Sequence, residues 1–466
     1  MILRDRARQE ALHEVYRQAA MNLLARFGAR SRSIEIAVME SAAADMARRM
    51  THRFLMARRL YLTIGLLLIG VDIAAGMLNR PEPIGLDFHT YAAAARVGLQ
   101  HGWSSIYDQR LVAMAQASLV PEQPTQPFLS PPPVAWLASL LAGLPYNLAF
   151  VVWSVATTLA LAWAVAWSCG SRSIGRWLAA GLVLTPWWVL IADRVGQVVP
   201  LVAVGILVAW RMIREDRDVA AGLMLGLVLL KPNTAFLVPV ALLAAGRKRT
   251  LISWLVPAGA GSILLVGTVG LSGLGSYVNE LAHPPPGTNA LSLEAAFGVG
   301  GLAGVGLRLT IIAVVIATAI GLRSSPGLAI ALGTVGSLLV TPYLHLSDLT
   351  LLAAAGLIVW QERPVILWRA PLTASWVLVN PLVATHFTPA QNRWPLFELA
   401  WLIALIASTW QANRQSRSEA KPSVESAFRW TANLGLPSAV NLLALRPAAN
   451  PINESANRTE VSPPAA

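Results

Sequence analysis

Charged residues are scarce in this chain. Asp, Glu, Lys and Arg make up 13% of its 466 residues, whereas soluble domains carry about 25%. Hydrophobic residues make up 55%, and one water-soluble core cannot bury that excess. Nearly uncharged runs such as 61–79, 251–271 and 394–410 are about long enough to cross the roughly 30 Å hydrocarbon layer as helices. The composition therefore predicts an all-α polytopic membrane protein.

Several sequence signatures are also missing. The chain has no Walker-type phosphate loop, no HExxH motif and no paired CxxC, so ATP-driven transport by this chain alone, zinc-protease chemistry and thiol-based chemistry lack support. The single cysteine, Cys169, excludes an intrachain disulfide. The first 55 residues contain no apolar run ahead of a small-residue cleavage site, so we expect no cleavable signal peptide.

Basic residues outnumber acidic ones by 36 to 24, a formal net charge of +12. In a soluble protein this excess would favour a nucleic-acid partner, but here the arginines stand mostly at the ends of apolar runs and indicate membrane topology instead. Arginines at 48–49 and 58–59 precede the first run, which places that side in the cytoplasm. We therefore expect both termini inside and the loops 80–132 and 272–306 outside, folded as short helices.

The apolar runs predict a bundle of about twelve transmembrane helices over residues 60–410. A cytoplasmic extension (1–59) precedes it and a largely disordered cytoplasmic tail (411–466) follows it. The segment 133–144 is too short for a comfortable crossing, so we interpret it as a re-entrant or interfacial helix. The predicted spans are 60–79, 147–169, 177–193, 198–212, 219–231, 233–246, 251–271, 307–322, 327–342, 348–361, 365–383 and 394–410.

Asp87 is the first polar residue of interest at an outer membrane end. It follows the first span in the sequence Gly85-Leu86-Asp87-Phe88, where a carboxylate could act as general base on an incoming hydroxyl. The alternative is a helix cap, since Asp commonly precedes an Ala-rich helix. Position alone leaves both interpretations open.

Three further residues stand at the outer ends of neighbouring spans, namely Arg194, Gln197 and Lys231. Cations at this depth could hold a phosphate, although a lysine that only reaches to the interface is the ordinary alternative. Pro232 directly after Lys231 marks a helix break, and broken helices often line a cavity. His345 also lies at an outer junction, where it could contact a phosphate or a reacting hydroxyl, or pair structurally with Asp348.

The order of these motifs resembles glycosyltransferase family 87, whose members use polyprenol-phosphate sugars and have the GT-C membrane fold. The resemblance extends over roughly residues 60–410. The matching motifs are Asp87-Phe88 with Tyr91, Ile106-Tyr107-Asp108, Ser130 to Pro133, Leu144-Pro145, Gly196-Gln197, Ala221-Gly222 with Gly226, Lys231-Pro232, Asn289 with Ser292, and Thr341-Pro342 with His345.

This resemblance implies a function. Such enzymes move a sugar, often mannose, from a polyprenyl-phosphate carrier to a lipid or glycan acceptor at the outer face of the bacterial cytoplasmic membrane. It assigns the general base of an inverting displacement to Asp87 and places His345 near the donor phosphate. We infer that Lys231, Arg194 and Gln197 are its companions, and we count Tyr91 among the substrate-binding residues.

The chemistry implied by the resemblance requires neither a metal nor a cofactor, because side-chain cations can neutralise the leaving phosphate. A secondary transporter or lipid flippase is the alternative, since many spans and broken helices suit it too. A transporter places its polar site near the bilayer midplane and often shows internal repeats. Here the candidate residues gather at one face and no clear repeat is found, which favours the enzyme.

Overall fold

The computed structural model describes residues 84–169, 186–283, 291–362 and 394–419, with a few single positions beside them. The chain divides into two compact units, Met1–Trp410 and Gln411–Ala466, and the helices discussed below lie in the first, apart from residues 411–419 of α19. Every regular element in the described ranges is helical. The longer helices are α3 (Leu86–His101), α4 (Gln109–Leu119), α6 (Tyr146–Ser168), α8 (Trp187–Val195), α9 (Val199–Ile213), α12 (Lys248–Ala282), α14 (Gly301–Ile320), α15 (Pro326–Val340), α16 (Thr350–Gln361) and α19 (Trp394–Glu419).

Short helices lie between them and mark the breaks in the bundle. They are α5 (Pro132–Ser139), α10 (Asp218–Met224), α11 (Leu237–Ala244) and α13 (Leu293–Phe297), with the 3₁₀ turns η1 (Trp103–Ser105), η2 (Leu225–Leu230), η3 (Pro232–Thr234) and η4 (Leu346–Leu349). Because 3₁₀ segments and prolines leave the regular hydrogen-bond ladder, these breaks are where backbone and side chains become available to a site.

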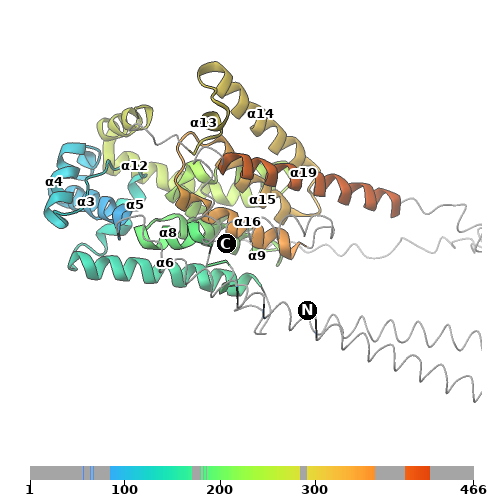
Figure 1. Cartoon of the computed structure of the whole chain (residues 1–466), viewed down its shortest axis with the longest axis horizontal. Helices are drawn as coiled ribbons and strands as arrows, with labels where there is room; N and C mark the ends of the chain where they lie inside the picture. The colour runs from blue at the N-terminus through green and yellow to red at the C-terminus, as the bar shows by residue number, and fades with distance from the viewer. Residues whose placement is uncertain are drawn as a thin grey trace, which may run out of the picture. The chain divides into compact units, whose positions relative to one another are not determined.

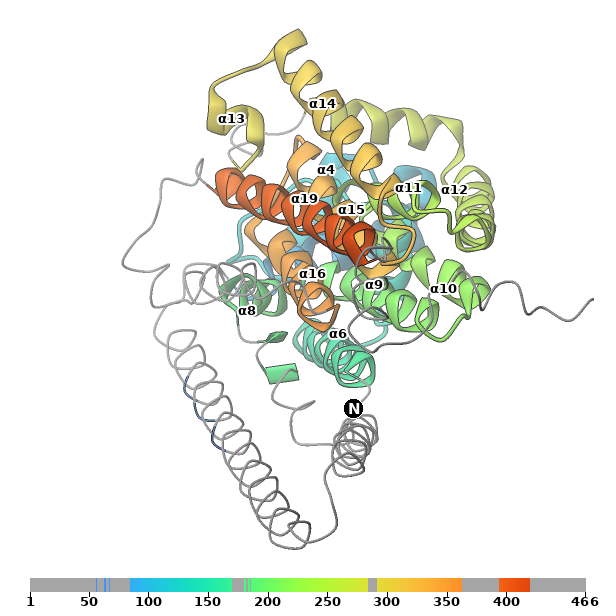
Figure 2. The ribbon, with the colours of Figure 1, turned by 90° about the vertical axis from the view of Figure 1, so that its right-hand side faces the viewer.

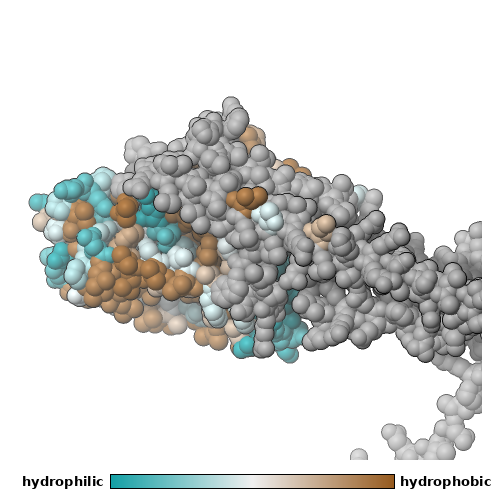
Figure 3. Space-filling view, turned by 60° about the horizontal axis from the view of Figure 1, so that its bottom comes forward, coloured by the Kyte–Doolittle hydropathy of each residue, from teal (hydrophilic) through white to brown (hydrophobic). Residues whose placement is uncertain are grey.

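Three described helices, α6, α12 and α14, are long and apolar enough to cross a membrane. On α6, Val151, Val155 and Leu159 are exposed, whereas Trp153 and Leu161 on the other face are buried. Figure 3 shows the hydrophobic side chains of this region as a continuous face beside a more hydrophilic end. An exposed apolar stripe of this kind is expected on a helix that faces lipid.

The other predicted spans have different outcomes. Shorter apolar helices correspond to the runs predicted near α9, α15, α16 and α19, so these helices are confirmed, while the count of twelve crossings stays a prediction. Apart from single positions at 56, 63 and 67 and the end of α19, the runs 60–79 and 365–383 and both polar extensions lie outside the described residues. The only helix in the short segment 133–144 is α5, which has eight residues and begins one position earlier, at Pro132.

The predicted break at Lys231 and Pro232 is confirmed. The helix α10 tightens into η2 and ends at Leu230, and Lys231 leaves helical geometry with φ −150° and ψ 72°. A single turn, η3, then leads into α11. With eight residues, α11 is about 12 Å long, so the predicted span 233–246 is shorter in the structure than in the sequence-based prediction.

The described part of the loop 80–132, which was predicted to lie outside, is helical, although α3 with its 16 residues is longer than the predicted short helices. Helix α3 packs against α4, α5 and η1, and these elements gather at the same end of the bundle (Figure 1). The described part of the predicted outer loop 272–306 also contains helical segments. The backbone leaves helical geometry at Gly270 (φ 71°, ψ 174°), and a second helical segment then runs to Ala282. This break stands where the predicted span 251–271 ends.

The centre of the bundle is α15, whose residues are all buried. A helix that is apolar and buried all round must be enclosed by other helices. Helices α11, α14 and α16 pack against α15, and α9 packs against α6, α10 and α16. Figure 2 shows α9, α15 and α16 together inside the bundle with α19 alongside. This core fixes the ends of the helices that carry the candidate site.

Candidate active site

The first turn of α3 is held by backbone contacts and not by a side-chain cap. Gly85 precedes the helix with φ 75°, and its N–H donates to the carbonyl of Arg194 at 2.8 Å. The Tyr146 hydroxyl donates to the carbonyl of Gly85 at 2.9 Å. The alternative role of Asp87 as a helix cap is therefore wrong, because Gly85 occupies the cap position and the Asp87 carboxylate points elsewhere.

The Asp87 carboxylate accepts a hydrogen bond from Nε2 of Gln197 at 2.9 Å. The other end of the Gln197 amide, Oε1, accepts from the Tyr91 hydroxyl at 2.7 Å and from the backbone N–H of Val198 at 3.1 Å. Gln197 and Tyr91 are each 3% exposed. Since Oε1 is occupied by two donors, the amide can only present its N–H groups to Asp87.

Gly196 creates the turn that aims Gln197. It ends α8 with φ 73°, a left-handed conformation, and a Cβ at this position would lie 2.6 Å from Cβ of Phe88. Both the backbone angle and the space therefore require glycine. The carbonyl of Gly196 also accepts a hydrogen bond from the Trp153 indole at 2.9 Å.

We expect Gly196→Ala to lower the thermal unfolding temperature of the protein in detergent micelles. The left-handed conformation alone costs an alanine about 1–2 kcal/mol, and the contact with Phe88 adds to that cost. Gly143→Ala is the matched control, because a Cβ there meets nothing within 4 Å. Equal stability of the two variants would contradict this account of the turn.

Lys231 and Asp348 form a buried ion pair, with 2.5 Å between Nζ and Oδ1. Lys231 is 6% exposed and Asp348 is fully buried. The alternative of a lysine that reaches to the membrane interface is therefore wrong. The sequence suggested that the His345 side chain pairs with Asp348. In the structure, Oδ2 of Asp348 instead accepts a hydrogen bond from the backbone N–H of His345 at 2.9 Å.

The His345 ring contacts Tyr343 instead. Nε2 of His345 lies 2.6 Å from the Tyr343 hydroxyl, and the two rings meet edge to face with centroids 4.8 Å apart. Both side chains are partly exposed. Tyr343 and Asp348 both act electrostatically on neighbouring groups of the site, so the turn before α16 contributes three side chains where the sequence had indicated one.

Electrostatic interactions connect Asp87 with the Lys231–Asp348 pair and with His345. The surrounding protein desolvates the Asp87 carboxyl and raises its pKa, while the nearby His345 and Lys231 and the hydrogen bond from Gln197 lower it. Asp348 acts on the same carboxyl and raises its pKa. Residues from distant parts of the chain therefore converge around Asp87, which remains partly exposed.

The structure thus brings together Asp87, Tyr91, Gln197, Lys231 and His345. Arg194 joins them at the edge through its carbonyl, which accepts from Gly85. Among the described residues no group of three or more His, Cys, Asp or Glu is placed to hold a metal ion. The arrangement offers a carboxylate that can take up a proton, beside an ammonium group and an imidazole that can contact an anion.

Asp348 and Tyr343 were not predicted as site residues. For Asp348 a signal exists, because it is the one acidic residue between Glu294 and Glu362 and a lysine buried in an apolar bundle needs an acidic partner. Tyr343 carries no comparable signal, since a tyrosine near a membrane end is ordinarily an interfacial residue.

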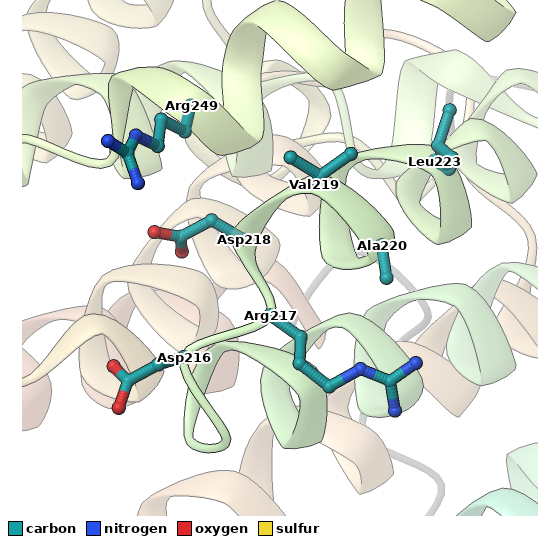
Figure 4. A pocket seen from close by; sticks show the side chains of 7 residues that line it. All are labelled: Asp216, Arg217, Asp218, Val219, Ala220, Leu223 and Arg249. Carbon is teal, nitrogen blue, oxygen red and sulfur yellow. The ribbon is translucent and has the colours of Figure 1, made fainter.

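A separate hollow of about 360 Å³ is lined by Asp216, Arg217, Asp218, Arg249 and three apolar side chains (Figure 4). Two of its four charged residues have partners. Asp218 is 3.5 Å from Arg247 and accepts from the Thr250 hydroxyl, and Arg217 lies 3.9 Å from Glu215. It lies on the arginine-rich side of α10, at the opposite end of α10 and η2 from Lys231, and contains none of the candidate residues.

Residues 128–378, more than half of the chain, match the model of glycosyltransferase family 87. The chain belongs to glycosyltransferase family 87. This glycosyltransferase matches no curated protein and no solved structure. The matched residues include Gln197, Lys231 and His345, whereas Asp87 and Tyr91 precede them. Family membership favours a glycosyltransferase over the alternative of a transporter or flippase.

Proposed function

We propose that this family 87 glycosyltransferase moves a hexosyl group, with mannose as the leading candidate, from a polyprenyl-phosphate sugar to a lipid or glycan acceptor. The reaction would take place at the outer face of the cytoplasmic membrane. The observation that carries the proposal is the placement of Asp87, held by Gln197, beside the Lys231–Asp348 pair and His345. A general base and a cationic anion-binding group are the two functions that such a transfer needs.

In this mechanism Asp87 accepts the proton of the acceptor hydroxyl as the acceptor oxygen bonds to the anomeric carbon. The bond between that carbon and the phosphate oxygen breaks, and its electron pair leaves with the lipid phosphate. A single displacement inverts the anomeric configuration. Asp87 ends the step protonated and the lipid phosphate ends it with one more negative charge.

Lys231 and His345 would stabilise that developing charge. The Lys231 ammonium has three N–H donors, one of which is directed at Asp348. Phosphate could therefore bind to Lys231 without displacing Asp348. Because Tyr343 contacts Nε2 of His345, it would fix the orientation of the imidazole. No metal or cofactor is part of the proposal.

The experiment is a transfer assay with the purified full chain in lipid nanodiscs. Polyprenyl-phosphate mannose, polyprenyl-phosphate glucose and a nucleotide sugar, each labelled in the sugar, are supplied with a total lipid extract as acceptor. We expect label to move from a lipid-linked donor to an acceptor with inversion at the anomeric carbon. Consumption of the nucleotide sugar alone, or retention of configuration, would overturn the proposed donor class or mechanism.

Gln197→Leu should move the acidic limb of the pH profile of kcat/KM to higher pH. The hydrogen bond from Gln197 stabilises the ionised form of Asp87 and lowers its pKa, so losing it raises that pKa. A general base must be ionised to act, and the rate then falls at a higher pH than in the parent. The measurement is transfer rate against pH with the preferred donor.

Gln109→Leu is the matched control for this pH profile. Gln109 lies in the same outer loop but binds the backbone of Phe128, away from Asp87. We expect its acidic limb to coincide with that of the parent protein. A limb that stays in place in Gln197→Leu would show that the amide does not act on the base.

A further inference from the structure

The hollow of about 360 Å³ at the start of α10 has no part in the proposed transfer reaction (Figure 4). Lys231 follows η2, at the other end of the same helical segment. Two acidic and two basic side chains line the hollow together with apolar side chains of α10, and the charged ones are Asp216, Arg217, Asp218 and Arg249. A cavity with charges of both signs calls for an explanation of its own.

The hollow lies where two helices enter their apolar segments. After Asp218 the chain carries no charge until Lys231, and after Arg249 it carries none until Glu280. Helix α12 is long and apolar enough to cross a membrane. Helices α10 and α12 pack closely, because a Cβ on Gly222 would lie 2.3 Å from a backbone oxygen of α12. The charged side chains therefore lie at the depth of lipid headgroups.

Only part of the charge in the hollow is neutralised within the protein. Asp218 lies 3.5 Å from the arginine that precedes α12, and Arg217 lies 3.9 Å from Glu215. Asp216 and Arg249 form no ion pair with any residue that the structure describes. Figure 4 shows Arg249, Asp218 and Asp216 extending to the same side, with Asp218 between the other two. This side therefore offers one available cation and one available carboxylate.

A ligand that fits this side carries both signs of charge. An anionic group would be attracted by Arg249 and repelled by Asp216, and a cationic group would meet the reverse. A zwitterion that joins a phosphate to a primary ammonium satisfies both residues. Arginine binds phosphate through its fork of N–H donors, and an ammonium donates N–H groups to a carboxylate. A trimethylammonium group has no N–H to donate.

The apolar surroundings indicate that this zwitterion belongs to a lipid. Val219 and Leu223 line the hollow and are 59% and 47% exposed. On the neighbouring helix α12, Ile252 and Val256 are 63% and 62% exposed. Acyl chains would cover these side chains, whereas a soluble zwitterion would leave them bare.

We propose that the hollow binds a phospholipid with a phosphoethanolamine headgroup. The phosphate binds Arg249, the ammonium binds Asp216, and the acyl chains lie along α10 and α12. The arginine-rich side of the bundle is the predicted cytoplasmic side, so this is a lipid of the inner leaflet. The inference goes beyond the proposed function and does not depend on it, because the two sites share no residue.

The test measures lipid binding to the full chain in detergent micelles by native mass spectrometry. The probes are phosphatidylethanolamine, phosphatidylcholine and phosphatidylglycerol with identical acyl chains, and soluble glycerophosphoethanolamine. We expect phosphatidylethanolamine to bind at least about fivefold more tightly than the other three probes, the effect of one satisfied charged contact. It should also raise the unfolding temperature of the protein, because a ligand of the folded state stabilises that state.

Two variants test the assigned contacts. Arg249→Gln should weaken binding of phosphatidylethanolamine by about 5- to 20-fold, because the phosphate loses a charged donor. Asp216→Asn should abolish the preference for phosphatidylethanolamine over phosphatidylglycerol, because the charge that attracts ammonium and repels an anionic lipid is gone. Asparagine tolerates the left-handed backbone of this position, φ 57°. Both variants should unfold at the temperature of the parent in lipid-free micelles.

Arg214→Gln is the matched control. Arg214 lies in the same turn, but its guanidinium lies over the Trp210 ring and it does not line the hollow. Its lipid affinities should equal those of the parent, and an equal loss in Arg214→Gln and Arg249→Gln would reduce the site to a general basic surface. Phosphatidylglycerol that binds as tightly as phosphatidylethanolamine, or a soluble headgroup that binds as tightly as the lipid, would also overturn the proposal.

Discussion

Asp87→Asn lowers the rate of sugar transfer by about 10²- to 10⁴-fold, the usual contribution of a general base. Asparagine has nearly the same shape, and its side-chain oxygen can still accept the hydrogen bond from Gln197. It cannot take up the proton of the acceptor hydroxyl. The loss should therefore appear in kcat, while the unfolding temperature and the affinity for the donor lipid change little.

The measurement is the initial rate of transfer with the preferred lipid-linked donor, at a pH where the parent is fully active. Asp108→Asn is the matched control, because Asp108 lies in the same loop 80–132 and caps α4, a role that asparagine performs equally well. Its rate should equal that of the parent. A rate for Asp87→Asn within about threefold of the parent would exclude Asp87 as the base, since general-base removal costs far more.

We expect Lys231→Met to lower both the stability of the protein and its transfer activity. Removing the ammonium leaves Asp348 buried without its ion partner, and breaking a buried pair from one side costs roughly 3–5 kcal/mol. The variant should therefore unfold at a lower temperature than the parent, or accumulate to a lower level in the membrane. The measurement is thermal unfolding in detergent micelles alongside transfer activity.

The double variant Lys231→Met/Asp348→Asn separates the two roles of the lysine. Removing both charges takes away the unpaired carboxylate, so stability should return towards the parent value. Transfer should stay low, because no ammonium remains to stabilise the leaving phosphate. Lys248→Met, at the exposed start of α12, controls for loss of a positive charge and should change neither property. A single Lys231→Met variant as stable as the parent would contradict the ion pair.

Much of the fold was predictable because lipid imposes a simple rule on composition. Apolar runs located the longer apolar helices but not α3 and α4, and the proline after Lys231 located the break that separates η2 from α11. Proline lacks the N–H that a continuous helix needs, so the helix break that it causes is local and can be predicted from the sequence. Within α12, the non-helical conformation of Gly270 falls where the predicted span 251–271 ends.

The site was only partly predictable because its contacts join distant segments. Asp87, Gln197, Lys231 and His345 were each chosen as a polar residue at an outer membrane end, and the structure brings them together. Which of them touch could not be predicted from spacing: Lys231 pairs with Asp348, 117 positions away.

The long separation of Lys231 and Asp348 along the chain affects how the protein is made. At a synthesis rate of about 5–20 residues per second, the 117 positions between them correspond to roughly 6–23 s of translation. During this interval a lysine destined for the apolar bundle has no carboxylate to bind, which is costly within lipid. The segment that carries Lys231 can therefore settle at its final depth only after the turn before α16 has entered the membrane, so this ion pair makes assembly of the first half of the bundle depend on the second.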